Sequence, residues 1–319
     1  MKYPQGLDFQ EKVDYIWGNG IFTDPMKISH RFIWIIAAGI WLYVSPDLAA
    51  QQEKYRYSET YRLVDVVNDA ATLINQSGKS AFPSFMKKGS RWRSGEMYIF
   101  VIDLKGNCFA HEDPSLVGKN LSDLKDPNGK PIIQWFIRKA LSQGQSGWTQ
   151  YRWVRPGDSI PSWKTTYTRL AKSPAGNIYI VGAGLYDMKM EKAFAVEAVD
   201  DALILIRQMG KKAFPLLRDS TSEFVYKDTY IFVVDSTYTV LVDLPFPDEE
   251  GKNVYDYHDI KGKYFFREFF KTVNEKGSGW VEYFWPRPGE TRPSPKTSYV
   301  KKIVVRGETF LVGTGIYLD

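Results

Sequence analysis

The sequence predicts an α+β protein built from two tandem copies of one domain, and three observations support this prediction. The stretch that starts at Gly147, GWTQYRWVRPGDSIPSWKTTY, returns at Gly279 as GWVEYFWPRPGETRPSPKTSY. A segment of helical periodicity precedes each copy, and short runs rich in Tyr, Ile, Phe and Val surround it. A spacing kept through a run this specific indicates a duplicated folding unit.

The repeat extends over most of the chain. The motif GKSAFP at Gly78 returns as GKKAFP at Gly210, and YIFVID at Tyr98 returns as YIFVVD at Tyr230, both at the spacing that separates Gly147 from Gly279. The closing strands, GAGLYD and GTGIYLD, align at nearly the same spacing. We therefore predict a first repeat at residues 51–187 and a second repeat at residues 188–319, each of a size typical of single domains.

The first fifty residues indicate export. The apolar run FIWIIAAGIWLYV, residues 32–44, would span ~20 Å as a helix, which is short against the ~30 Å hydrocarbon core of a membrane. Lys27 and Arg31 precede this run and SPDLAA follows it, which is the three-part pattern of a secretory signal. Residues 26–50 are therefore predicted to be a signal peptide of a periplasmic or secreted protein. The alternative is an uncleaved inner-membrane anchor formed by residues 32–44.

Residues 1–25 are unusual, because a signal peptide normally has only a few residues ahead of its basic region. We hypothesise that translation starts at Met26, so that the extension at residues 1–25 is an artefact of a wrongly assigned start site. N-terminal sequencing of the exported protein tests this hypothesis: a start near Gln51 supports cleavage, and an intact Met1 contradicts it.

Each repeat is expected to begin with a long amphipathic helix. Apolar residues recur at spacings of three and four in residues 51–85, and again in residues 191–214. The Phe-Pro pairs at Phe82 and Phe214 are predicted to mark the ends of these helices, because proline disfavours helical backbone in the residue before it.

Each repeat is expected to form a sheet of five to six strands, of which five can be assigned, with a helical segment after the second strand. The expected strands are residues 97–103, 108–111, 147–154, 162–170 and 177–186 in the first repeat, with counterparts at residues 229–235 and near Gly279, Pro295 and Thr309 in the second. The helical segments are expected at residues 132–142 and 265–274. The last three strands of each repeat are joined by short Gly- and Pro-rich loops, which cannot hold a crossover helix, so the sheet is expected to be antiparallel.

These motifs, taken in order, resemble the Cache domain family in its single-Cache form, present here in tandem. The motifs that carry the likeness are YIFVID, HEDPSLVGKNLSDLKDPNGK, GWTQYRW and VGAGLYD, with GWVEYFWPRPG, PKTSYV and VGTGIYLD in the second repeat. The resemblance implies a PAS-like fold and a module that senses small organic acids or similar metabolites outside the cytoplasm. Many relatives continue into a signalling domain, whereas this sequence ends after the second repeat, so a sensing role implies a membrane signalling partner.

Composition and motifs argue against several other classes of function. The formal net charge of +5 is small and dispersed, so nucleic acid is not an expected partner. Cys108 is the only cysteine, which excludes an internal disulfide and a Cys-x-x-Cys redox pair. The sequence has no catalytic triad, no His-Glu-x-x-His, no Walker loop and no EF-hand spacing, so we expect no enzymatic activity, metal or cofactor. The glycines of GAGLY and GTGIY are interpreted as close-packing strand positions.

The candidate ligand-binding residues recur in both repeats. Lys164 and Lys296 occupy the same strand position, where either they face solvent or their ammonium groups reach a pocket and pair with a ligand carboxylate. The remaining candidates are aromatic or polar residues expected near these lysines: Tyr98, His111, Tyr151, Trp153 and Tyr167 in the first repeat, and Tyr230, Asp243, Tyr283, Trp285 and Tyr299 in the second.

The aromatic candidates have two possible roles. Tyr151 and Trp153 alternate along a strand and therefore share one face, where they form either the apolar wall of a pocket or simply part of the core. Tyr167 could donate a hydrogen bond to the same anion as Lys164, or to a nearby backbone group. His111 in the first repeat is matched by Asp243 in the second, so we hypothesise that the first repeat binds an anion and the second has changed or lost its specificity.

The sequence thus favours an exported small-molecule sensor that binds a small carboxylate. The competing hypothesis is an extracytoplasmic interaction scaffold without a ligand, in which the same aromatic residues only fill the core.

Overall fold

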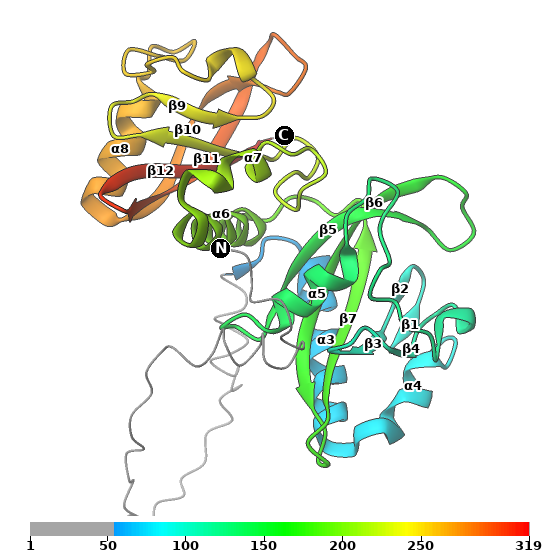
Figure 1. Cartoon of the computed structure of the whole chain (residues 1–319). Helices are drawn as coiled ribbons and strands as arrows, with labels where there is room; N and C mark the ends of the chain where they lie inside the picture. The colour runs from blue at the N-terminus through cyan, green and yellow to red at the C-terminus, as the bar shows by residue number, and fades with distance from the viewer. Residues whose placement is uncertain (1–53, 319) are drawn as a thin grey trace, which may run out of the picture. The chain divides into compact units, whose positions relative to one another are not determined.

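The computed structural model describes residues 54–318 (Figure 1). The expected signal peptide at residues 26–50, its apolar run and the extension at residues 1–25 lie outside the described residues. Across residues 54–318, no helix combines the length and the apolar character needed to cross a membrane.

The first repeat begins with a long helix, α3 (Ser58–Ser77), which continues through a 3-10 turn (Gly78–Ala81) into the short helix α4 (Phe82–Met86). The second repeat begins in the same way, with α6 (Lys192–Met209), a 3-10 turn and α7 (Phe214–Leu217). The expectation that the Phe-Pro pairs end the long helices is wrong, because both pairs start the following short helix. Proline fits the first turn of a helix, where its missing N–H needs no partner, whereas the long helices end at Gly78 and Gly210, which have positive φ.

A five-stranded antiparallel sheet forms the centre of the first repeat, as expected. Its spatial order is β4-β3-β7-β6-β5. The strands are β3 (Phe100–Asp103), β4 (Cys108–Ala110), β5 (Ser146–Val154), β6 (Pro161–Lys172) and β7 (Ile178–Tyr186). The expected strand at residues 97–103 is divided, because its first two residues form β2 (Met97–Tyr98) in a separate small hairpin with β1 (Arg93–Ser94).

The sheet of the second repeat has the same topology, with the order β9-β8-β12-β11-β10. The strands are β8 (Ile231–Asp235), β9 (Val240–Asp243), β10 (Ser278–Pro286), β11 (Pro293–Val305) and β12 (Glu308–Tyr317). The duplication in the sequence is therefore a duplication of the whole fold.

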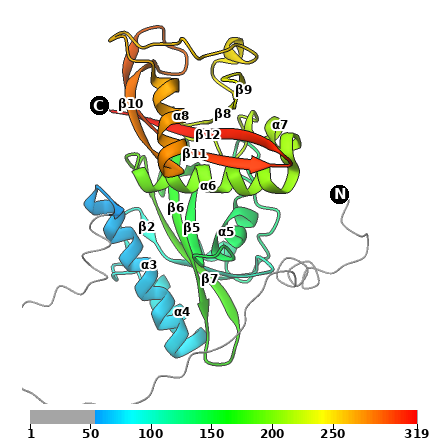
Figure 2. The same ribbon diagram turned by 90° about the vertical axis from the view of Figure 1, so that its left-hand side faces the viewer.

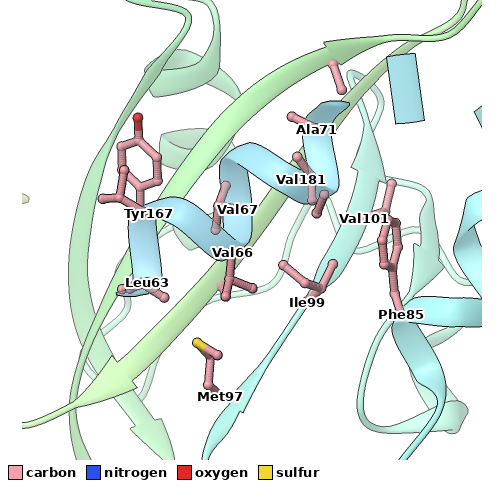
Figure 3. Close-up of a cluster of buried hydrophobic side chains, with 14 of the residues drawn as sticks. Leu63, Val66, Val67, Ala71, Phe85, Met97, Ile99, Val101, Tyr167 and Val181 are labelled. Atoms are coloured by element: carbon pink, nitrogen blue, oxygen red, sulfur yellow. The ribbon is translucent and has the colours of Figure 1, made fainter. Parts of the chain in front are cut away.

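Helices cover both faces of each sheet, so each repeat has two apolar layers. In the first repeat α3 buries Leu63, Val67 and Ala71 against Val181 of the sheet (Figure 3). The opposite face carries α5 (Ile132–Ala140) (Figure 2). Phe136 of this helix packs on Tyr151 of β5. In the second repeat α6 covers one face and α8 (Phe265–Lys276) covers the other. The candidate residues are divided between these two layers, which decides which of them can share a site.

Candidate functional site

Lys164 is the central residue of the candidate site in the first repeat. It lies on β6 opposite Tyr151 of β5, and only 2% of its surface is exposed. Its Nζ donates hydrogen bonds to Tyr98 Oη at 2.9 Å and to Tyr186 Oη at 3.4 Å. The same ammonium lies 4.1 Å and 4.8 Å from the centroids of these two rings. The alternative that Lys164 faces solvent is therefore wrong, and two phenols together with their rings surround its charge.

The electrostatic environment of Lys164 is unusual for a buried cation. Among the described residues, no carboxylate lies within ion-pair distance of its Nζ, and the negative charges of Glu112 and Glu96 act on it only from farther away. Burial lowers the pKa of Lys164 to about 7, because an ammonium group that leaves water loses its hydration. A carboxylate that reached Nζ would provide the missing counter-charge and would raise this pKa again.

His111 lies beside Tyr98 and Lys164 as a neutral imidazole. Its ring centroid is 5.0 Å from that of Tyr98. Burial, together with the positive charge of Lys164, lowers its pKa to about 4. The backbone N–H of Asp113 donates to His111 Nδ1 at 2.9 Å, so the neutral ring carries its proton on Nε2. That N–H is a hydrogen-bond donor that adds no charge to the site.

Tyr151 and Trp153 extend the site along β5, as their alternation predicts. Their ring centroids are 6.1 Å apart, and Tyr151 Oη shares a buried 2.9 Å hydrogen bond with Thr166 Oγ1. Burial raises the pKa of Tyr151 well above its usual value. The phenol therefore stays neutral at physiological pH and can act as donor or acceptor.

Two contributors were missed by the sequence reasoning: Thr166 and Tyr186. Tyr186 Oη contacts Lys164 and also donates to the Val154 carbonyl at 2.8 Å. A Cβ on Gly184 would lie 2.7 Å from Lys164 Cε and 2.5 Å from Thr166 Oγ1. The close-packing interpretation of this glycine is confirmed. The signal that could have identified Tyr186 was its recurrence as Tyr317 in the closing strand of the second repeat.

The second repeat contains an equivalent arrangement. Lys296 is 1% exposed, and its Nζ donates to Tyr230 Oη at 3.0 Å and lies 4.7 Å from the ring of Tyr317. Tyr283 Oη shares a 3.0 Å hydrogen bond with Ser298 Oγ, as Tyr151 does with Thr166. Burial lowers the pKa of Lys296, whose ordinary value is 10.5, to about 7.

Asp243 distinguishes the second site from the first. The residue is 8% exposed, and its Oδ1 is buried without a hydrogen-bond partner among the described residues. Burial raises the pKa of Asp243 to about 7, and the charge of Lys296 opposes this shift. In contrast to His111, the residue at this position can carry a negative charge.

The expectation that Tyr167 and Tyr299 share the anion site requires correction. Tyr167 lies on the α3 side of the sheet (Figure 3), where its ring packs against Trp148 with the centroids 4.8 Å apart and the planes inclined at 45°. Tyr299 packs in the same way, 5.3 Å from Trp280, against the α6 layer. Residues three apart in a strand point to opposite faces, so Lys164 and Tyr167 cannot meet.

Lys164 and Lys296 are 2% and 1% exposed, and their surroundings are closely packed. A Cβ on the neighbouring glycine would lie 2.7 Å from Lys164 Cε at Gly184, and closer still to Lys296 Cε at Gly315. A cavity of about 510 Å³ is lined by Tyr55, Glu191, Tyr226, Arg287 and Tyr317 among others, and of these Tyr317 also lies against Lys296. A ligand can therefore reach either ammonium only if neighbouring side chains move.

Together, the two sheets with helices on both faces define a tandem protein of the PAS-like α+β class. The Cache domain family model matches residues 62–201 and again residues 200–319, so the chain belongs to the Cache domain family.

Several known proteins are similar to parts of this chain. The methyl-accepting chemotaxis protein McpP of Pseudomonas putida is 33% identical over 108 residues, which is 34% of this chain and 19% of that protein. The chain thus matches about a fifth of the length of this curated relative. A periplasmic sensor domain of a chemotaxis protein is 31% identical, with a TM-score of 0.35, and the match covers 39% of this chain and 92% of that one. A Cache chemosensory domain described for carboxylic acid recognition is 25% identical, with a TM-score of 0.35, over 39% of this chain and 91% of that one.

Proposed function

We propose that this protein is an extracytoplasmic sensor that binds a small carboxylate in its first repeat and transmits the signal through a membrane partner. Membership of the Cache family and the similarity to chemotaxis sensors support the class of function. The apolar run at residues 32–44 supports export. No enzymatic step is part of the proposal.

The observation that carries the proposal is the buried ammonium of Lys164, which within residues 54–318 has phenols and aromatic rings around it but no carboxylate in contact. Burying such a charge is costly unless a partner compensates it. A ligand carboxylate would supply both the opposite charge and hydrogen-bond acceptors for Lys164 and for the Nε2–H of His111. Tyr151 and Trp153 would then form the wall against the apolar part of the ligand.

A thermal-shift screen of the full chain against short-chain carboxylic acids, amino acids and amines tests the proposal. A ligand at about 100 times its dissociation constant stabilises a protein by ~2.7 kcal/mol, which corresponds to roughly 5 to 11 °C for ~150 to 250 residues and to less for a larger body. A carboxylate that raises the melting temperature of the wild type, but not that of Lys164→Met, supports the proposal.

The competing function is an interaction scaffold without a ligand. The near-complete burial of Lys164 and Lys296 favours this alternative, because a tightly packed lysine can have a purely structural role, in which it positions the tyrosines around it. Silence across the whole panel, with a correctly folded chain, would favour the scaffold over the sensor.

A further inference from the structure

The second repeat differs from the first at three positions around its buried lysine. Asp243 replaces His111 at the end of the second strand of the sheet. Phe246 replaces Asp113 as the N-cap of the 3-10 turn that follows. Phe265 replaces Ile132 as the first residue of the helix that covers this face. The exchanges place a buried carboxylate where the first repeat has an imidazole, and add two phenyl rings to the same layer. The carboxylate that they remove, Asp113, is exposed and accepts a hydrogen bond from Ser115 of its own turn.

The added rings join those that the two repeats have in common. Phe246 lies 5.7 Å from Trp285 and 6.3 Å from Tyr230, and Phe265 stacks on Tyr283 at 4.4 Å. Aromatic faces attract ammonium groups because the ring quadrupole places negative charge above and below the ring plane. An apolar acid gains nothing specific from this change, whereas an ammonium group does.

The carboxylate of Asp243 carries a charge opposite to that of Lys296, but the two groups are not in contact. In the described part of the chain Asp243 and Lys296 form no ion pair, although each charge acts on the pKa of the other. The charge of Asp243 also acts on Tyr230, Tyr283 and Tyr317, so the carboxylate with its buried, unpartnered Oδ1 belongs to the same site. A buried cation and a buried anion that do not meet are complementary to a ligand that carries both charges.

We propose that the second repeat binds a small zwitterion, with the ligand ammonium at Asp243 and the aromatic rings, and the ligand carboxylate at Lys296. This arrangement satisfies the unpartnered Oδ1 and gives Lys296 its counter-ion. It also leaves the site neutral, whereas a simple amine or a simple acid would leave one net charge buried. The inference rests on the proposed function, since it assumes that the lysine faces of the Cache repeats bind small molecules.

Calorimetry on the full chain tests the inference with three matched probes: a short-chain amino acid, the carboxylic acid of the same length and the primary amine of the same length. The Lys164→Met background isolates the second repeat. There the amino acid is expected to bind at least about 10-fold more tightly than the other two probes, because each of them leaves one charged group unpaired. Asp243→Asn keeps the shape but removes the charge, and should abolish the preference for the amino acid over the carboxylic acid.

The outcomes separate this inference from the function on which it rests. Carboxylic acids that bind through Lys164, together with amino acids that do not bind in the Lys164→Met background, would overturn the zwitterion site alone. An unchanged amino-acid affinity in Asp243→Asn would also overturn it. Silence of all three probes, in the wild type and in the Lys164→Met background, would overturn both proposals. Phe246→Leu keeps both charges and removes one ring, so a several-fold weaker affinity in this variant supports the site even if Asp243→Asn fails to fold.

Discussion

The ammonium of Lys164 donates to the phenol of Tyr98 at 2.9 Å, and the same contact recurs between Lys296 and Tyr230 at 3.0 Å. In both repeats the two residues are 66 positions apart in the sequence. Both repeats have therefore retained a buried lysine whose ammonium donates a hydrogen bond to a tyrosine, although burying an ammonium lowers the free energy of unfolding. If such a lysine binds a ligand, its replacement by an apolar residue abolishes ligand binding. If its role is only structural, the replacement leaves ligand binding unchanged.

Lys164→Met is expected to abolish carboxylate binding while the fold is retained. Methionine has a similar length and no charge, so it removes the cost of burying an ammonium but also one hydrogen bond to Tyr98. An isolated buried charge is costly, and even whole buried ion pairs can often be replaced by apolar side chains without loss of stability. We expect an unfolding free energy in urea at or above that of the wild type. Unchanged carboxylate affinity would reject the binding role, and a large loss of stability would indicate a structural role.

The free energy of unfolding is expected to rise between about pH 7 and pH 10. The pKa of Lys164 is about 7 in the folded chain and 10.5 in the unfolded chain, so the unfolded chain binds more protons in this range. The slope from one such group is at most about 1.4 kcal/mol per pH unit. Urea titrations at several pH values should show this rise, with a smaller slope in Lys164→Met. Equal slopes in the two proteins would mean that the pKa of Lys164 is not lowered in the folded chain.

Gly184→Ala is expected to displace Lys164. The added methyl group would lie 2.7 Å from Lys164 Cε, and overpacking of this kind typically costs about 1–3 kcal/mol. Stability should fall, and carboxylate affinity should fall with it. Gly144→Ala is the matched control, because a Cβ there would meet nothing closer than 3.8 Å. If both variants behave like the wild type, Gly184 does not position the lysine.

Tyr151→Phe and Tyr167→Phe should have different effects, although both residues are buried tyrosines of the same sheet. Tyr151→Phe removes a buried hydrogen bond to Thr166 on the Lys164 face, which costs about 1 kcal/mol and should weaken carboxylate binding several-fold. Tyr167 lies on the α3 side, so its loss of a hydroxyl should leave affinity unchanged. Calorimetry on the two variants checks this. A larger loss of affinity in Tyr167→Phe would contradict the assignment of faces.

The duplicated α+β fold could be predicted without the structure, because the fixed spacing of the repeated motifs and the periods of helix and strand are properties of the chain alone. The prediction that Tyr151 and Trp153 share a face also succeeded, since alternation along a strand is local geometry. The position of the long-helix ends was wrong, because the Phe-Pro pairs are equally compatible with the start of a new helix, and Gly78 decides the matter through its positive φ.

The burial of Lys164 and the identity of its neighbours depend on tertiary packing. Tyr98, His111 and Tyr186 come from three other segments, and hydrogen bonding between strands far apart in the sequence brings them to one ammonium group. In the same way, the isolation of Asp243 from Lys296 depends on the packing of side chains from two strands that are not neighbours in the sheet. Burial and charge separation arise from contacts between distant segments, and no local pattern in the sequence encodes those contacts.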